Sequence, residues 1–286
     1  MRIVVVGGGR LGATLAAALA DANHAVTLVV RGAHRRDALR ADPRWRGVHM
    51  VQDTSQAPPS DVDIWTVPDR ALPDARVRDA SSAPVALHAA GSLPADVLGA
   101  PTGVARGVLH PLAACPDPLT VRDAAPLRGA SFGLSGDVTA TAVAEALTRD
   151  LGGRPLPLPE GASTAYHAAA ALAANDLAAL LLAAERTGIA VGLEAEPLRR
   201  GLVHLARTAL DALDRVPQDR PWVDGLTGAV ARGDDATLGA HLHVLDHDAR
   251  RLHAAASRGL IDALGTTGRL QPVVLQRLRD VIDEPQ

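Results

Sequence analysis

The sequence predicts an α/β fold, with a Rossmann doubly wound parallel sheet in the N-terminal part and an all-α domain after it. Three observations lead to this prediction. A β-branched run at residues 2–6 is followed at once by the glycine-rich stretch GGGRLG. Strand-like and helix-like segments then alternate, which is typical of βαβ units around a parallel sheet. From about Ala162 onward only helical patterns remain.

The N-terminal part can be divided into its elements in order. Residues 3–6 are apolar at every position, as expected for a strand that is buried on both faces. A helix is expected from the glycine-rich stretch to about Asn23. Further strands are expected at residues 24–30, 61–67, 83–89 and 103–110. The segments GASFGLSG and RPLPLP predict one or two more strands, around a helix at 138–151.

The C-terminal part shows only helical patterns, with a domain boundary near Pro159–Gly161. Residues 1–160 then form the α/β domain and residues 161–286 the helical domain. Its most apolar stretch, HAAAALAANDLAALLLAAE, carries Asn175 and Asp176 in its middle. Because charge at a bilayer centre is costly, we expect a buried helix there and no membrane span. Helices are expected at residues 162–188, 195–215, 235–259 and 270–282.

Composition excludes several classes of protein. With 47% hydrophobic and 21% charged residues and a net charge of −3, the chain of 286 residues reads as an ordinary globular protein. There is no basic excess, so neither nucleic acid nor an anionic membrane is an expected partner. The single cysteine, Cys115, forms no internal disulfide and fits a reducing compartment. The first residues lack the features of a secretory signal, so a cytoplasmic location is expected.

The glycine-rich stretch predicts a dinucleotide site. Gly7, Gly9 and Gly12 form G-x-G-x-x-G between a buried strand and a helix, the context that gives this pattern weight. The first glycine allows a tight turn, the second lets backbone approach a pyrophosphate, and the third permits close helix–strand packing. The N–H groups at the start of the helix would hold the phosphate. A glycine-rich turn without a ligand is the alternative.

The residue after the second strand distinguishes the two nicotinamide dinucleotides. An NAD site favours Asp or Glu there, to accept a hydrogen bond from the ribose 2′-hydroxyl. This chain has Arg31, followed by His34, Arg35 and Arg36. A guanidinium matches a phosphate and cannot accept from a hydroxyl, so we infer NADP(H). The alternative, arginines at a solvated helix start, applies better to Arg35 and Arg36 than to Arg31.

Taken together, the chain resembles the Rossmann-like proteins of unknown function related to pyrroline-5-carboxylate reductase, 2-dehydropantoate 2-reductase and the wider 6-phosphogluconate dehydrogenase-like group. The resemblance runs nearly end to end, and it implies an NADP-binding domain, a helical domain that dimerises, and no particular substrate. The strings that carry it are GGGRLG, TVPD (66–69), LHAAGS (87–92), LHPL (109–112), SGD (135–137), AYHAAAALAAN (165–175) and LTGAVARGDDATLGAHL (226–242).

The same resemblance implies further cofactor-binding residues. Relatives commonly carry a hydroxyl residue where this chain has Ala90, a departure that bears on the inherited mechanism, although Ser92 follows two residues later. The implied cofactor contacts beyond the glycines and Arg31 are Arg10, Leu11, Val67, Pro68, Gly91 and Ser92.

His110 is the first candidate for chemistry. Pro111 has no N–H to give to a strand ladder, so the strand is expected to stop there with His110 at its carboxyl end. Ligands bind at the carboxyl ends of strands in open α/β sheets. The His-Pro pair is similar to that of prephenate dehydrogenases, where the histidine bonds the reacting hydroxyl. A histidine with a near-neutral pKa can give or take a proton; the alternative is a histidine that bonds only backbone.

Tyr166, His167 and Asn175 lie on the first long helix of the C-terminal part. On a regular α-helix His167 and Asn175 are about two turns apart, with about 80° between them. The resemblance implies that they take the places of a Lys and an Asn that reach into the cleft of related dehydrogenases. Alternatively, Asn175 bonds a neighbouring helix. Tyr166, the only tyrosine, is a candidate for substrate binding.

Arg232, in ARGDD, is a candidate anion clamp for the substrate, although the segment also reads as a helix start capped by Asp234 or Asp235. His243 and His247 are four residues apart, but no carboxylate pattern accompanies them, so no metal is expected.

These residues predict an NADP-dependent oxidoreductase that transfers a hydride between NADP(H) and a small carbonyl, imine or hydroxy compound, with His110 or His167 moving the proton. The alternative is a redox-inactive NADP-binding sensor or scaffold, which Ala90 and the missing lysine favour. A helical interaction module with a vestigial nucleotide site fits the intact glycines and Arg31 poorly. The partners expected are a small-molecule substrate and a second copy of the chain, in a homodimer through the helical domain.

Overall fold

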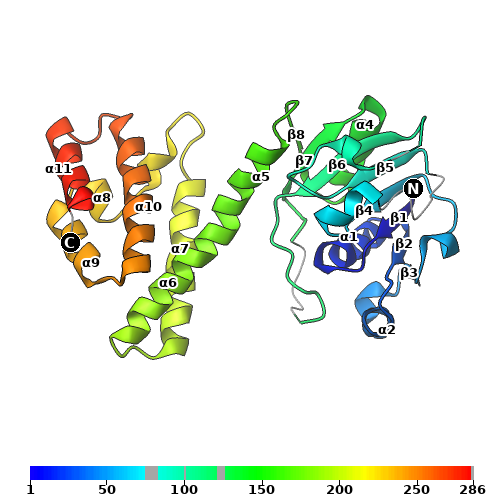
Figure 1. Ribbon diagram of the computed structural model, residues 1–286, viewed down its shortest axis with the longest axis horizontal. Coiled ribbons are helices and arrows are strands. Elements are labelled where there is room, and N and C mark those ends of the chain that lie inside the picture. Colours follow the sequence, from blue (N-terminus) through cyan, green and yellow to red (C-terminus); the bar gives the residue numbers. More distant parts are fainter. Residues whose placement is uncertain (75–82, 100, 121–125, 285–286) are drawn as a thin grey trace. The chain divides into compact units, whose positions relative to one another are not determined.

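The computed structural model describes residues 1–74, 83–99, 101–120 and 126–284, and the chain divides into two compact units (Figure 1). The predicted order, an α/β part followed by an all-α part, is confirmed. The units are Met1–Leu172 and Ala173–Gln286, so they divide inside the long helical segment and not near Pro159–Gly161. The physical reason is that Tyr166, in the first turns of that segment, hydrogen-bonds the end of the sheet.

The first unit is built on one eight-stranded sheet of order β3-β2-β1-β4-β5-β6-β7-β8. All neighbouring strands are parallel except β6 and β7, which are antiparallel. The strands are β1 (Arg2–Val6), β2 (Ala25–Val29), β3 (Val48–Val51), β4 (Val62–Trp65), β5 (Val85–His88), β6 (Ala105–Pro111), β7 (Ser131–Gly136) and β8 (Arg154–Pro157).

The strand order reverses at β1, with β2 and β3 on one side and β4 to β8 on the other. A reversal of this kind opens a crevice at the carboxyl ends of the two central strands, because the following helices leave on opposite faces. The glycine-rich loop follows β1, and Thr66 to Pro68 follow β4, so both reach this crevice.

The α-helices of the first unit among the described residues are α1 (Arg10–Asp21), α2 (Ala33–Ala41), α4 (Val138–Asp150) and α5 (Ser163–Ala171), and of these α1 and α4 pack on the sheet. Helix α1 buries Ala13, Leu15, Ala16 and Leu19 against the sheet, where they join the main core. It ends two residues before the expected Asn23, which adopts a left-handed conformation with φ of 64°.

Strand β3 was not predicted. It has only four residues, and an exposed His49 interrupts its apolar run, so its pattern is too short to separate from a loop.

Strand β6 ends at Pro111, so the expectation that His110 lies at the carboxyl end of its strand is confirmed. Pro111 pairs with Phe132 of β7, and the Leu112 N–H donates to the Ser131 carbonyl at 2.8 Å. Successive N–H groups of a strand point to opposite sides, so the position of Pro111 faces the β5 side, where pairing already ends at Val108. A missing N–H therefore costs nothing at this position.

The second unit is helical: α6 (Leu177–Ala190), α7 (Ala195–Asp214), α8 (Ala229–Arg232), α9 (Asp235–Val244), α10 (His247–Gly265) and α11 (Pro272–Asp283). The helix expected at 235–259 is thus two helices, because Asp246 caps α10 by accepting from the Ala249 N–H at 2.8 Å. His243 and His247 consequently lie on different helices. Leu238, Ile261 and Leu278 are central to the core of this unit.

The long apolar helix is not buried, contrary to expectation. Ala183 is the only residue of α6 that is buried, and α7 buries none. By length and composition alone, the stretch Ser163–Ala190 could cross a membrane: its most apolar 18 residues have a mean hydropathy of 1.5, and only 6% of them are buried.

Candidate functional site

The glycine-rich loop takes the three roles expected of its glycines. Gly7 has a φ of +120°, which side chains rarely adopt. A Cβ on Gly12 would lie 1.9 Å from the Gly7 carbonyl oxygen, so only glycine lets α1 start this close to β1. A Cβ on Gly9 would meet nothing within 4 Å. The loop therefore presents open backbone at Gly9 alone, the glycine expected to face a pyrophosphate.

A crevice of 480 Å³ opens beside this loop. Thr66 links the segment after β4 to the glycine-rich loop after β1, because its hydroxyl donates to the Gly7 carbonyl at 2.9 Å. This residue was not predicted, although its place at the end of the strand next to β1 could have pointed to it. Of the expected cofactor residues, Gly7, Gly9, Leu11, Val67 and Pro68 line the crevice, together with Gly8, Thr66, Asp69, Ala89 and Ala90.

The arginines that follow β2 have different roles. Arg31 is exposed, two residues after the end of β2, and its charge lowers the pKa of Asp53 alongside stronger effects of hydrogen bonds from Ser55. Arg36 donates to the Val30 carbonyl at 3.0 Å, and Arg35 donates to the Gly8 carbonyl. Arg35 and Arg36 are therefore bound to backbone and are not a merely solvated helix start.

Arg35 also ties the loop to a distant segment. Its two terminal nitrogens donate to the Asp117 carboxylate at 3.0 and 3.2 Å. These bonds, and the N–H of Leu119, lower the pKa of Asp117. Arg10, at the first residue of α1, is exposed and adds its charge to the same effect. Arg35 thus links Gly8 of the glycine-rich loop to Asp117.

Buried His88 shapes the loop that follows β5. Its Nδ1 accepts from the Ala90 N–H at 3.2 Å, so its Nε2 must carry the proton that bonds the Pro94 carbonyl at 3.0 Å. Burial lowers the pKa of His88, which favours this neutral form. Two residues further, the Ser92 hydroxyl donates to the Asp69 carboxylate at 3.2 Å.

His110 and Tyr166 form the centre of a polar cluster next to the crevice. His110 Nδ1 lies 2.9 Å from the Tyr166 hydroxyl, and the rings meet edge-on with centroids 5.4 Å apart. The same hydroxyl donates to the His110 carbonyl at 3.2 Å. A Cβ on Gly133, which pairs with His110 across β6 and β7, would lie 2.5 Å from the tyrosine ring. Glycine at that position thus makes room for Tyr166.

His167 completes the cluster. Its ring meets that of His110 at 5.5 Å between centroids, and its Nδ1 is buried without a hydrogen-bond partner in the described part of the chain. A Cβ on Gly91 would lie 2.8 Å from that nitrogen and 2.9 Å from the His110 ring. An unpaired buried nitrogen is costly, so this atom is where a bound molecule or water would make a bond.

The environment sets the protonation of the cluster. Burial lowers the pKa of His110 to about 4, with His167 acting in the same direction. Burial raises the pKa of Tyr166 to about 12. The expected near-neutral pKa of His110 is therefore wrong: its ring is neutral at pH 7, and Tyr166 keeps its proton.

The other two candidates belong to the second unit. Asn175 is exposed within the π-helical turn Leu172–Asp176, so the 80° expected between it and His167 on a regular helix does not apply. Arg232 ends α8 and is exposed, and its charge contributes to a lowered pKa of the helix-capping Asp234. Three or more metal-ligating side chains do not gather anywhere among the described residues.

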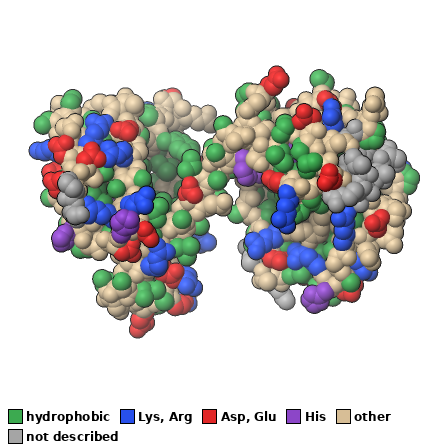
Figure 2. Space-filling view, in the orientation of Figure 1, with side chains coloured by type: hydrophobic (Ala, Val, Ile, Leu, Met, Phe, Trp, Pro, Cys, Tyr) green, Lys and Arg blue, Asp and Glu red, His purple; other side chains and the backbone are tan. Residues whose placement is uncertain are grey.

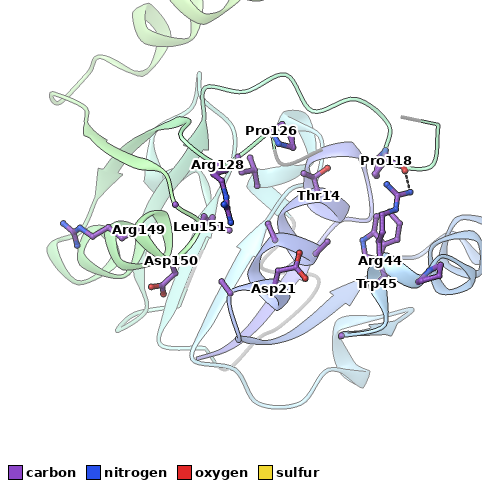
Figure 3. A pocket seen from close by; sticks show the side chains of 17 residues that line it. Thr14, Asp21, Arg44, Trp45, Pro118, Pro126, Arg128, Arg149, Asp150 and Leu151 are labelled. Carbon is purple, nitrogen blue, oxygen red and sulfur yellow. Dashed lines mark hydrogen bonds between the residues drawn. The ribbon is translucent and has the colours of Figure 1, made fainter. Parts of the chain in front are cut away.

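A cavity of 730 Å³ lies elsewhere, along the outer side of α1 (Figure 3). On one side Arg44 bonds the Pro118 carbonyl, and on the other Arg149 is paired with Glu145 at 2.7 Å. Two of the arginines that line this cavity are thus already bonded within the protein. The cavity shares no lining residue with the glycine-loop crevice.

Two sequence profiles match the chain. Residues 3–71 match that of ketopantoate reductase (PanE/ApbA), and residues 130–259 match that of a domain of unknown function (DUF2520). No curated protein matches this chain in sequence.

Solved structures match over nearly the whole chain. A Bacteroides fragilis protein, provisionally assigned as an NADP oxidoreductase, has 19% identity and a TM-score of 0.71 over 91% of this chain and 97% of its own. Coxiella burnetii pyrroline-5-carboxylate reductase has 15% identity and a TM-score of 0.60, over 98% of each chain. The Plasmodium falciparum pyrroline carboxylate reductase, solved with NADP bound, has 11% identity and a TM-score of 0.59, over 99% of this chain and 98% of its own. These matches confirm the predicted fold, including the helical domain of the 6-phosphogluconate dehydrogenase-like type.

Proposed function

We propose that this chain, a Rossmann-like relative of the pyrroline-5-carboxylate and 2-dehydropantoate reductases, is an NADP(H)-dependent oxidoreductase that acts in the cytoplasm on a small carbonyl, imine or hydroxy compound. One observation carries the proposal. Ala89 and Ala90 line the glycine-loop crevice, and the next residue, Gly91, lies against His110 and His167. A continuous loop therefore joins a dinucleotide crevice to a cluster of proton-bearing side chains.

The residues present fit a nicotinamide dinucleotide. The open backbone at Gly9 and the N–H groups at the start of α1 would hold the pyrophosphate, and the unpaired His167 Nδ1 would find a partner at the nicotinamide end. The bound cofactor would supply or accept the hydride. The protein's own part is to orient the substrate beside Gly91 and to exchange a proton at His110, Tyr166 or His167.

We expect NADPH to bind at least about tenfold more tightly than NADH, because Arg31 would give the 2′-phosphate a charge-assisted bond worth about 1.5–3 kcal/mol. Calorimetric titration of both cofactors measures the ratio, and Arg31→Ala should abolish the preference. Arg36→Ala is the matched control, since Arg36 is bound to the Val30 carbonyl, and it should keep the preference. Equal affinities in the unmodified protein would contradict NADP(H) as the cofactor.

Single-turnover oxidation of NADPH with a panel of cyclic imines and 2-keto acids tests the reaction itself. Oxidation with at least one class of substrate supports the oxidoreductase. Tight NADPH binding without oxidation by any of them would favour a sensor or scaffold instead.

The helical unit supports a proposed homodimer. Large apolar side chains of α6 and α7 are exposed, and hydrophobic side chains appear at the surface of this unit in Figure 2. A second copy in a twofold arrangement would cover the same surface on both chains. The side chains concerned include Leu180, Leu182, Ile189, Leu205 and Leu210.

Light scattering at micromolar concentration should therefore report twice the chain mass of 29.5 kDa. Leu182→Glu combined with Leu205→Glu should halve that mass, because buried charge at an interface is costly. Val138→Glu, at an apolar side chain of the first unit that is 89% exposed, should change nothing. A monomer in the unmodified protein would rule out the dimer.

A further inference from the structure

Asp69 places a carboxylate at the edge of the proposed reaction site. It is the first residue of the short helix η3 (Asp69–Ala71), directly after Val67 and Pro68, and it lines the glycine-loop crevice. Its Oδ2 accepts from the Ser92 hydroxyl at 3.2 Å, on the same loop as Gly91. The string TVPD (66–69) contains this residue, but nothing in it indicates the contact with Ser92, which lies in the loop after a different strand.

Asp69 is the one carboxylate among the groups that act on His110 in the described residues. The groups that act on His110 are two histidines, His167 and His88, and one carboxylate, Asp69, which opposes their effect. The chain contains no lysine, and no arginine is among the groups acting on His110 in the described residues. A carboxylate this close to the cluster favours a positively charged ligand over a neutral one.

The protonation of the cluster points the same way. A carbonyl oxygen must gain a proton as the carbonyl group is reduced, whereas the nitrogen of a protonated imine already carries that proton. His110 is neutral at pH 7, and Tyr166, with a pKa of about 12, is a weak acid. Neither is a ready proton source at neutral pH.

We propose that Asp69 is a specificity-determining residue that selects a substrate with positive charge at the reacting centre, a protonated imine or, in the reverse direction, an amine. This inference rests on the proposed function. In the reductive direction the imine carbon receives a hydride, and the π electron pair of the C=N bond becomes the lone pair of the nitrogen. The products are a neutral amine and the oxidised cofactor, so no further proton is required.

The first test is a binding experiment that needs no turnover. Pyrrolidine, a cyclic amine that is protonated at neutral pH, is titrated calorimetrically into the protein saturated with NADP⁺. Binding should weaken about tenfold or more in Asp69→Asn, because the charge-assisted contact is lost while side-chain size is kept. Cyclopentanol, a neutral ring of the same size, should bind equally to both proteins.

Two control variants separate the carboxylate from its surroundings. Asp96→Asn removes a carboxylate that acts on His88 and is not among the groups acting on His110, and it should leave pyrrolidine binding unchanged. Ser92→Ala removes the hydrogen bond to Asp69 but keeps the charge, so most of the pyrrolidine affinity should remain.

The second test compares reduction of 1-pyrroline and cyclopentanone, which differ in the atom that carries the double bond. Asp69→Asn should lower kcat/KM for 1-pyrroline and leave that for cyclopentanone unchanged. Unchanged pyrrolidine affinity in Asp69→Asn, with NADPH affinity intact, would overturn the role of Asp69 and leave the proposed function standing. Weakened NADPH binding in the same variant would instead assign Asp69 to the cofactor ribose. Failure of the unmodified protein to bind NADPH would remove the proposed function itself.

Discussion

His110→Ala should lower turnover by at least about 10²-fold while leaving the affinity for NADPH nearly unchanged. The variant removes the imidazole beside Gly91 and also the partner that fixes the Tyr166 hydroxyl at 2.9 Å. Loss of a positioned polar group, or a displacement of about 1 Å at a reacting centre, costs about this factor. The glycine loop and Arg31, which would hold the phosphates, do not involve His110. Steady-state kinetics and calorimetry with NADPH measure the two quantities.

His24→Ala is the matched control. His24 is also a half-buried histidine of the first unit, but it lies before β2, at the opposite end of the strands, where it bonds Asp150 at 3.1 Å. Its removal should lower the melting temperature and leave turnover intact. If His110→Ala instead kept full turnover with a lower melting temperature, His110 would be a structural residue, and His167 would be the next side chain of the cluster to test.

The pH dependence offers a separate check on His110. Its pKa of about 4 lies below the unfolded value of about 6.5, so the folded protein resists protonating this ring. Its contribution to stability is complete above about pH 6.5 and is lost as the pH falls toward 4. Titration of His110 should accordingly produce no step in the rate between pH 6.5 and 8.

The glycine loop could be predicted in detail from the sequence because its physics is local. Gly7, Gly9 and Gly12 act within a single strand–turn–helix segment, where spacing alone assigns the tight turn, the open backbone and the close packing. The same holds for the strands of the sheet, except β3, whose four residues are too few to show a period.

The polar cluster could be predicted only in part, because its contacts are long-range. His110 and Tyr166 are 56 residues apart in sequence, and nothing in either neighbourhood indicates their hydrogen bond. The low pKa of His110 likewise depends on burial by elements far along the chain. Arg35 looked like a solvated residue for the same reason: its partner Asp117 is 82 residues away.

The helix spacing between His167 and Asn175 was misjudged for a different reason. A count of residues assumes a regular helix, but Leu172–Asp176 is π-helical, with wider hydrogen-bonded turns and less rotation per residue. Such turns have no reliable sequence signature. The division of the chain at Leu172 was missed in the same region, since the start of this helix is bound to the sheet through Tyr166.

Substitutions at Gly9 and Gly12 should separate cofactor binding from folding. Gly12→Ala would place a Cβ 1.9 Å from the Gly7 carbonyl oxygen and 2.3 Å from the Thr66 hydroxyl, so backbone must move. Overpacking of this kind costs about 1–3 kcal/mol or more, and the displaced loop should also lose NADPH affinity. Gly9→Ala should keep stability within about 0.5 kcal/mol, because nothing lies within 4 Å and its φ of −69° suits any residue.

Gly9→Ala should nevertheless weaken NADPH binding at least about tenfold, since the new methyl group occupies the space where the pyrophosphate would contact the backbone. Thermal unfolding and calorimetric titration distinguish the two variants: Gly12→Ala loses both stability and affinity, Gly9→Ala loses affinity alone. Gly47→Ala, whose Cβ would make an ordinary contact of 3.6 Å outside the crevice, controls for adding a methyl group and should change neither. Normal NADPH binding by Gly9→Ala would mean that the pyrophosphate does not approach this loop, and the dinucleotide site would have to be sought elsewhere in the first unit.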